Sequence, residues 1–137
     1  MTVMSSPYDV SLSDMPLLRS LTAQAMRPNM LVVCSNADVQ TAFEQVCGFL
    51  APPFTVCLLP GPLDLPTGEK GTLFLHDIAA LTQPQQRFLY DWLSTRGKGV
   101  QVVSMTGSQM LPLVETGRFH EGLFYRLNII STVVGSA

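Results

Sequence analysis

Short apolar runs that alternate with amphipathic segments constrain the fold of this chain more than any other feature. The runs are rich in strand-forming residues and lie at residues 30–34, 54–59, 72–75, 100–103 and 129–134. The segments between them carry apolar residues at helical spacing. Strands that are apolar on both faces are typical of a parallel sheet with helices on both sides. We therefore predict a three-layer α/β domain around a five-stranded, mainly parallel sheet.

The predicted helices have recognisable start and stop signals. They cover residues 13–27, 36–50, 82–96, 108–116 and 119–127. Thr82 and Gln85 have the spacing of a capping box, and Ser108 is predicted to cap the fourth helix. We expect Phe88 and Trp92 to lie in the core. Residues 1–137 are predicted to form one domain, with residues 1–12 as a flexible lead-in.

The charge pattern excludes several classes of function. Charged residues make up 13% of the chain, with 8 Lys and Arg against 10 Asp and Glu and a net charge of −2. Nucleic-acid binders usually carry a basic stripe, and none is present here, so we expect no direct nucleic-acid contact. No apolar run approaches the about 20 residues that span a bilayer, and residues 1–9 lack the basic region followed by an apolar stretch that is typical of an export signal. We expect a cytoplasmic protein without membrane contact.

Polar residues follow several of the predicted strands. Ligands of parallel α/β sheets bind at the carboxyl ends of the strands. Candidate site residues are therefore those at 35–38, at 76–77 and at 106–108. Cys34, Cys47 and Cys57 lack the spacing of a metal site, and we expect them to be free thiols in a reducing compartment.

Two long segments resemble a known family. Residues 71–78 read GTLFLHDI, and residues 117–128 read GRFHEGLFYRLN. The first resembles the Walker B strand, usually GTLFLDEI, of the AAA+ domain of sigma-54-dependent transcriptional activators. The second is similar to GRFREDLYYRLN, which carries the arginine fingers of that family. The resemblance is close over residues 71–130, and it extends over residues 13–59 only by element order and hydrophobicity. It implies the sheet order 5-1-4-3-2.

The resemblance also implies where ATP and magnesium, the cofactors of the family, would bind. Ser35, Asn36, Asp38 and Thr41 fall in the phosphate-binding loop, which here lacks both the glycines and the lysine. Asp38 would place a negative charge beside a triphosphate. We therefore expect no nucleotide cofactor and regard this loop as degenerate.

The catalytic positions of the family have changed as well. His76 and Asp77 replace the Walker B Asp and Glu, and magnesium prefers oxygen ligands to histidine. The asparagine that senses the γ-phosphate falls on Gly107. The first arginine finger falls on His120, so Arg126 alone remains. These combined losses predict that the chain is not an ATPase.

We also expect this chain to lack two larger structural features of the family. The GAFTGA loop that grips the sigma factor lies between the second and third strands of the family, where this chain has only residues 60–70. We expect no lid subdomain after the fifth strand. The segment that survives packs against the adjacent protomer in the family, which implies an interface at Arg118, Phe119, His120 and Arg126. We expect a protein partner, either a second copy or an intact sigma-54 activator, and a role in transcription regulation.

Several alternatives remain open. In one alternative, the chain is a weak ATP-binding protein with a rearranged nucleotide site. In another, it is a general adaptor module. His76, Asp77 and His120 have the chemistry of a zinc site, although in the family the position of His120 faces the neighbouring subunit. Cys34 with His76 has the chemistry of a nucleophile and its base. Arg126 has a purely structural interpretation as a salt bridge or a helix cap.

Overall fold

The structure is a computed structural model that describes residues 8–9, 28–35, 38–48, 50–95 and 99–133. The helix predicted over residues 13–27 lies outside these residues, as do Asn36 of the phosphate-loop segment and the predicted helix end at Gly97. Within the described residues, every helix is too short or too polar to cross a bilayer.

A parallel sheet with helices on both faces forms the domain. Its strands are β1 (Tyr8–Asp9), β2 (Met30–Val33), β3 (Phe54–Leu58), β4 (Gly71–His76), β5 (Val100–Thr106) and β6 (Ile130–Val133). The helices are α2 (Val39–Cys47), the 3₁₀ helix η2 (Ile78–Ala80), α3 (Gln83–Thr95), α4 (Met110–Glu115) and α5 (Glu121–Leu127).

The sheet order is β1-β6-β2-β5-β4-β3, and every pair of neighbouring strands is parallel. The five strands from β2 to β6 therefore have the predicted order 5-1-4-3-2. One strand was not predicted: Tyr8–Asp9 pairs with Ile130 and Ser131 of β6, within the segment expected to be a flexible lead-in.

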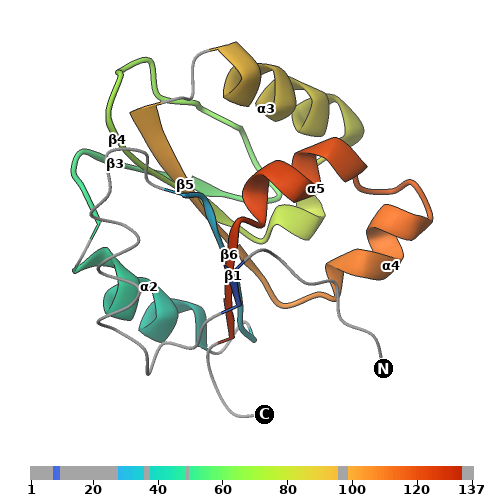
Figure 1. Ribbon diagram of the computed structural model, residues 1–137, viewed down its shortest axis with the longest axis horizontal. Coiled ribbons are helices and arrows are strands. Elements are labelled where there is room, and N and C mark those ends of the chain that lie inside the picture. Colours follow the sequence, from blue (N-terminus) through green and yellow to red (C-terminus); the bar gives the residue numbers. More distant parts are fainter. Residues whose placement is uncertain (1–7, 10–27, 36–37, 49, 96–98, 134–137) are drawn as a thin grey trace.

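The sheet has one apolar cluster on each face, because successive side chains of a strand point to opposite sides. α2 covers one face, and α3, α4 and α5 cover the other (Figure 1). On the α2 face, Met30 and Val103 pack with Val46 of the helix. On the opposite face, Leu73 and Leu75 of β4 pack in the cluster that includes α3 and α5.

The helix starts predicted for α3 and α4 agree with the structure to different degrees. The capping box of α3 is confirmed, because Gln85 N donates to Thr82 Oγ1 at 3.2 Å and Thr82 N donates to Gln85 Oε1 at 3.0 Å. The predicted cap of α4 is wrong by one residue: Gln109 occupies that position, without a side-chain hydrogen bond. Ser108 instead lies in a turn, where its N–H donates to Thr106 Oγ1 at 3.0 Å.

Two predictions of burial are wrong. Phe88 is 56% exposed rather than part of the core, since it lies outside the stripe of α3 that faces the sheet. β3 was expected to be buried on both faces, yet Phe54, Val56 and Leu58 are 44%, 50% and 65% exposed. β3 is the last strand of the sheet, and α2 packs over the strands beside it.

Candidate functional site

The segment between β2 and α2 forms a turn that is closed by its own side chains. Ser35 Oγ donates to Asp38 Oδ2 at 2.8 Å, and Asp38 N donates to Ser35 O at 3.0 Å. Asp38 precedes the first residue of α2, and Thr41 is exposed in the first turn of that helix. A carboxylate at this position is stabilised by the helix dipole, which otherwise favours a bound anion. The turn therefore supplies its own negative charge at the helix N-terminus.

His76 and Asp77 lie at the carboxyl end of β4 and are partly exposed. Their backbones are hydrogen-bonded: Leu59 N donates to His76 O at 3.1 Å, and Asp77 N donates to Met105 O at 2.9 Å. Asp77 has φ 68°, in the left-handed region that aspartate tolerates better than most residues. Their side chains make no hydrogen bond to the described residues. These two side chains are thus available at the strand end.

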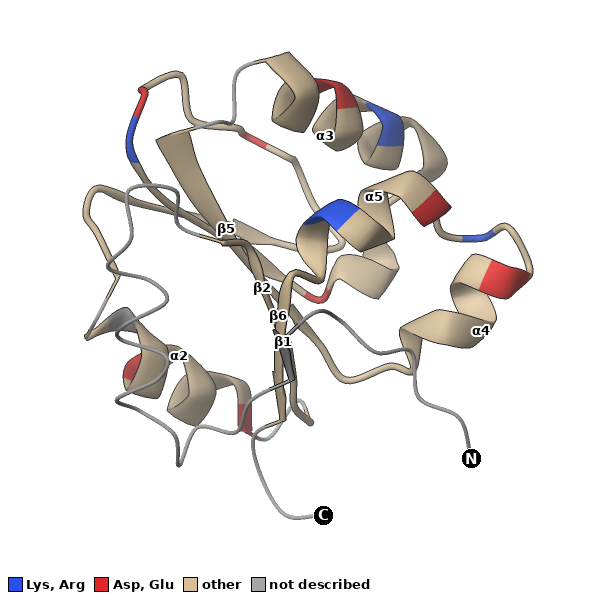
Figure 2. Ribbon diagram, in the orientation of Figure 1, with Lys and Arg blue, Asp and Glu red and all other residues tan. Residues whose placement is uncertain are grey.

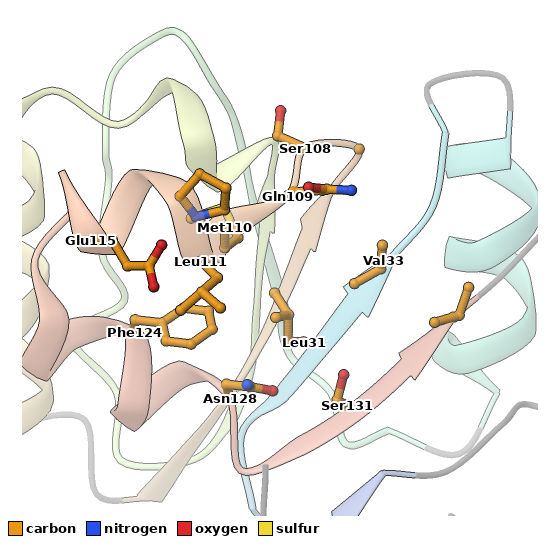
Figure 3. Close-up of a pocket in the computed structure, with 13 residues that line it drawn as sticks. Leu31, Val33, Ser108, Gln109, Met110, Leu111, Glu115, Phe124, Asn128 and Ser131 are labelled. Atoms are coloured by element: carbon orange, nitrogen blue, oxygen red, sulfur yellow. The ribbon is translucent and has the colours of Figure 1, made fainter. Parts of the chain in front are cut away.

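A pocket of about 510 Å³ lies on the face of the sheet covered by α4 and α5 (Figure 3). Leu31 of β2 lines one side of it, and Met110 of α4 and Phe124 of α5 line the other. Among the described residues predicted for the nucleotide site, Gly107 lines this pocket, whereas Ser35, Asp38, Thr41, His76 and Asp77 do not. The pocket is therefore separate from the positions where the resemblance places the phosphates.

The segment before α5 is held to α3 by a buried glutamine that the sequence analysis missed. Gln86 is 2% exposed, and its Nε2 donates to Leu81 O at 3.1 Å and to Arg118 O at 3.0 Å. Its Oε1 accepts the His120 N–H at 2.8 Å. Local sequence does not reveal this role, because Arg118 and His120 lie 32 and 34 positions from Gln86 along the chain.

Tyr90 of α3 contacts both His120 and Arg126, the positions where the resemblance places the arginine fingers. The His120 ring centroid is 4.7 Å from the Tyr90 centroid, and His120 Nδ1 caps α5 by accepting the Leu123 N–H at 2.9 Å. The Arg126 Cζ atom lies 4.7 Å from the same tyrosine centroid, and Arg126 Nη1 donates to Ser94 Oγ at 2.8 Å. Arg126 is thus an exposed cation held on an aromatic ring, and its side-chain partners among the described residues include no carboxylate.

The other two predicted interface residues are placed differently. Arg118 is exposed, while Phe119 is 2% exposed and belongs to the core cluster on this face of the sheet. Phe119 is therefore unavailable to a partner, because its side chain anchors the turn that presents Arg118. In Figure 2 the basic residues of the described part lie singly rather than in a stripe.

The environment of the thiols argues against a cysteine nucleophile. Cys34 and Cys57 are free, and each is 3% exposed. Burial raises the pKa of the Cys34 thiol, and the negative charge of Asp38 raises it further. An activated cysteine needs a lowered pKa, so this site has the opposite character. Among the described residues, no group of three or more His, Cys, Asp or Glu side chains has the geometry to hold a metal ion.

We expect the Cys34 and Cys57 thiols to be unreactive in the folded protein. In a Cys47→Ser variant, both should react with DTNB at least about a hundredfold more slowly than in urea-unfolded protein, because modification requires opening of the structure. In the folded protein the pKa values of both thiols are raised above their ordinary value of 9.0, which favours the neutral thiols. The neutral thiols therefore contribute to the stability of the fold below pH 9.0, and this contribution falls as the pH rises above that value. Rapid labelling of either thiol in native buffer would contradict this expectation.

Comparisons with known proteins agree with this architecture. The sequence pattern of the family described as the sigma-54 interaction domain matches residues 61–134. This chain belongs to that family. The domain is 24% identical over 125 residues to a protein of Escherichia coli (strain K12) named "Putative uric acid sigma-54-dependent transcriptional regulator UacR". That match covers 82% of this chain and 21% of UacR, so the chain spans about a fifth of the length of this relative.

Solved structures share the fold of this sigma-54 interaction domain. NtrX from Brucella abortus in complex with ATP has a TM-score of 0.67 at 16% identity, over 99% of this chain and 37% of that one. The P-loop NTPase domain of a sigma-54 activator from E. coli has a TM-score of 0.53 at 14% identity, over 81% of this chain and 98% of that one. The sheet of this sigma-54 interaction domain therefore has the arrangement of a P-loop NTPase.

Proposed function

We propose that this sigma-54 interaction domain does not hydrolyse ATP and acts in transcription regulation through contact with a protein, either a second copy or an intact sigma-54 activator. The observation that carries this proposal is the turn between β2 and α2. There the Asp38 carboxylate stands at the start of the helix and accepts a hydrogen bond from Ser35. A triphosphate at this place would need backbone donors and a lysine, and it would meet a carboxylate instead.

The catalytic positions support the same proposal. His76 stands where the family has the aspartate that holds magnesium through water, and imidazole is a poor substitute for oxygen at magnesium. Arg126 is braced by Tyr90 and Ser94 of its own chain. An arginine finger accelerates hydrolysis only when the metal and phosphate sites are also in place. The retained arginine therefore serves a contact surface in this proposal.

The surface that we propose for the contact combines Arg118, Tyr125 and Arg126. Tyr125 is 48% exposed, and both arginines are exposed. Arginine and tyrosine are enriched among the residues that dominate protein–protein affinity. Tyr90 limits the freedom of the Arg126 side chain before a partner binds, which lowers the entropy lost on association.

One observation favours the alternative of a weak ATP-binding protein. The side chains of His76 and Asp77 have no hydrogen-bond partner among the described residues, and they stand at the carboxyl end of β4. A rearranged nucleotide site that uses them would stabilise the fold on addition of ATP and magnesium. At a concentration of 100 times Kd the gain would be about 2.7 kcal/mol. A clear rise in Tm with ATP would favour this alternative.

We expect Arg126→Ala to weaken binding to the protein partner without unfolding the domain. Immobilised chain should capture purified intact sigma-54 activator. The variant should lower the affinity at least about tenfold, or about 1.4 kcal/mol. The matched control is Arg87→Ala, which removes an exposed arginine from α3 and should bind as the unmodified chain does. Equal capture by all three proteins would refute the proposed surface, and absence of capture would refute the contact function.

A further inference from the structure

The outer edge of β3 combines free backbone groups with an exposed apolar strip. β3 ends the sheet on the side away from β1, so one of its edges has no neighbour among the described strands. Thr72 N donates to Pro53 O, and Leu59 N donates to His76 O. Backbone groups of a strand alternate between its two neighbours, so the odd-numbered residues of β3 bond to β4. Phe54, Val56 and Leu58 therefore point their backbone groups outward.

The side chains of these same three residues form the strip. Cys57 and Leu59 face the α3 side of the sheet and are buried. Phe54, Val56 and Leu58 face the α2 side, where the Phe54 ring centroid is 5.9 Å from that of Phe74. They remain about half exposed, because α2 packs over the neighbouring strands and leaves β3 uncovered.

The usual protection of a sheet edge is missing here. Natural proteins shield edge strands with charged side chains, bulges or prolines within the strand. Residues 50–63 contain no charged residue, and the prolines at 52, 53, 60 and 62 lie outside the five residues of β3. The chain segment after β3 turns at Gly61, and the Gly61 backbone lies close to Leu58 O. The Gly61 carbonyl accepts a hydrogen bond from Gln85 Nε2 of α3. The segment therefore leaves the strip open on the α2 side.

We infer that a second copy of this chain pairs antiparallel with the free edge of β3. A two-fold axis through Val56 places Val56 opposite its counterpart and Phe54 opposite Leu58 of the second copy. In that register the outward N–H and C=O groups of Val56 meet those of the other strand, as in a hydrogen-bonded antiparallel pair. The exposed apolar side chains of both strands then lie on one face as cross-strand neighbours.

The symmetry of the strip favours a second copy over an unrelated peptide. An uncharged strand with apolar residues at alternate positions on both sides of its centre is complementary to itself, as a two-fold interface requires. Five residues on each side form a small interface, compared with the about 20–30 of a standard one. The dimer is therefore weak and reversible, and it leaves the surface around Arg126 on α5 free.

Sedimentation velocity of the full chain tests this inference. From about 10 μM to about 500 μM, a range suited to a weak interface, the sedimentation coefficient should rise towards that of a dimer. Val56→Lys should weaken association at least about tenfold, because the two-fold pairing would place two ammonium groups directly opposite each other. Phe88→Lys, which changes an equally exposed apolar residue on α3, should dimerise as the unmodified chain does. Arg126→Ala should also dimerise, which separates this edge from the proposed partner surface.

Two results would overturn the inference. One is a monomer at every concentration, which would leave the edge to a different occupant such as an extended peptide. The other is undiminished association of Val56→Lys. If that variant does not fold by circular dichroism, Leu58→Lys at the most exposed position of the strip replaces it, with the same expected loss.

Discussion

Phe74→Ala should lower the free energy of unfolding by about 3–5 kcal/mol, the range measured for truncation of buried aromatic residues. Phe74 lies in β4 and is 2% exposed. Its ring centroid is 4.7 Å from that of Phe43 of α2 and 5.9 Å from that of Phe54 of β3. The truncation would open a cavity where these three elements meet. Total stabilities of domains are about 5–15 kcal/mol, so the variant should lose a substantial fraction of the total.

Urea unfolding followed by circular dichroism measures this effect. The matched control is Phe88→Ala, the same substitution at a phenylalanine that is 56% exposed on α3. We expect the control to change the free energy by less than about 1 kcal/mol, as surface substitutions usually do. Similar losses in the two variants would show that Phe74 is not the centre of packing between α2 and the sheet.

Gln86→Leu should lower the free energy of unfolding by about 2–4 kcal/mol, because it leaves buried backbone groups without partners. Leu81 O and His120 N would each lose the amide that satisfies them. Arg118 O would keep the bond from Gln83 Nε2 at 2.8 Å. The turn that leads into α5 should then loosen, since the amide of Gln86 ties it to α3.

The control for Gln86→Leu is Gln45→Leu at an exposed position of α2. It makes the same change of side chain without removing a buried hydrogen bond, so its effect should stay within about 0.5 kcal/mol. Urea unfolding of both variants compares the two sites directly. A loss below about 1 kcal/mol for Gln86→Leu would mean that the carbonyl and N–H groups find water or other partners.

Much of the scaffold was predictable because buried strands and helix starts leave local signals. The apolar runs identified β2 to β6, and Thr82 with Gln85 identified the start of α3. The backbone conformation explains the glycines at the start of the two segments that resemble the family. Gly71 has φ 122°, and a Cβ there would lie 2.5 Å from Pro53 O, while Gly117 has φ 79°. Glycine adopts such conformations without steric penalty, so these two positions favour glycine for reasons of backbone conformation.

The features that local sequence could not predict depend on contacts between distant residues. An apolar run does not reveal whether its strand lies in the centre or at the edge of a sheet, so the exposure of Phe54, Val56 and Leu58 was missed. The tyrosine brace joins Tyr90 to Arg126, 36 positions apart along the chain. Periodicity along α3 gave no indication that Tyr90 or Gln86 would support the segment before α5. The positions proposed for the nucleotide site followed from the resemblance, and the Ser35–Asp38 bond required the structure.

Calorimetric titration of ATP with magnesium into the purified chain most directly tests the proposal that this domain has lost its nucleotide site. We expect no saturable heat up to millimolar nucleotide, since a triphosphate would meet the Asp38 carboxylate at the start of α2. An intact sigma-54 activator domain titrated under the same conditions provides the positive control. Saturable binding to this chain with a Kd below about 1 mM, or about −4.1 kcal/mol, would contradict the account.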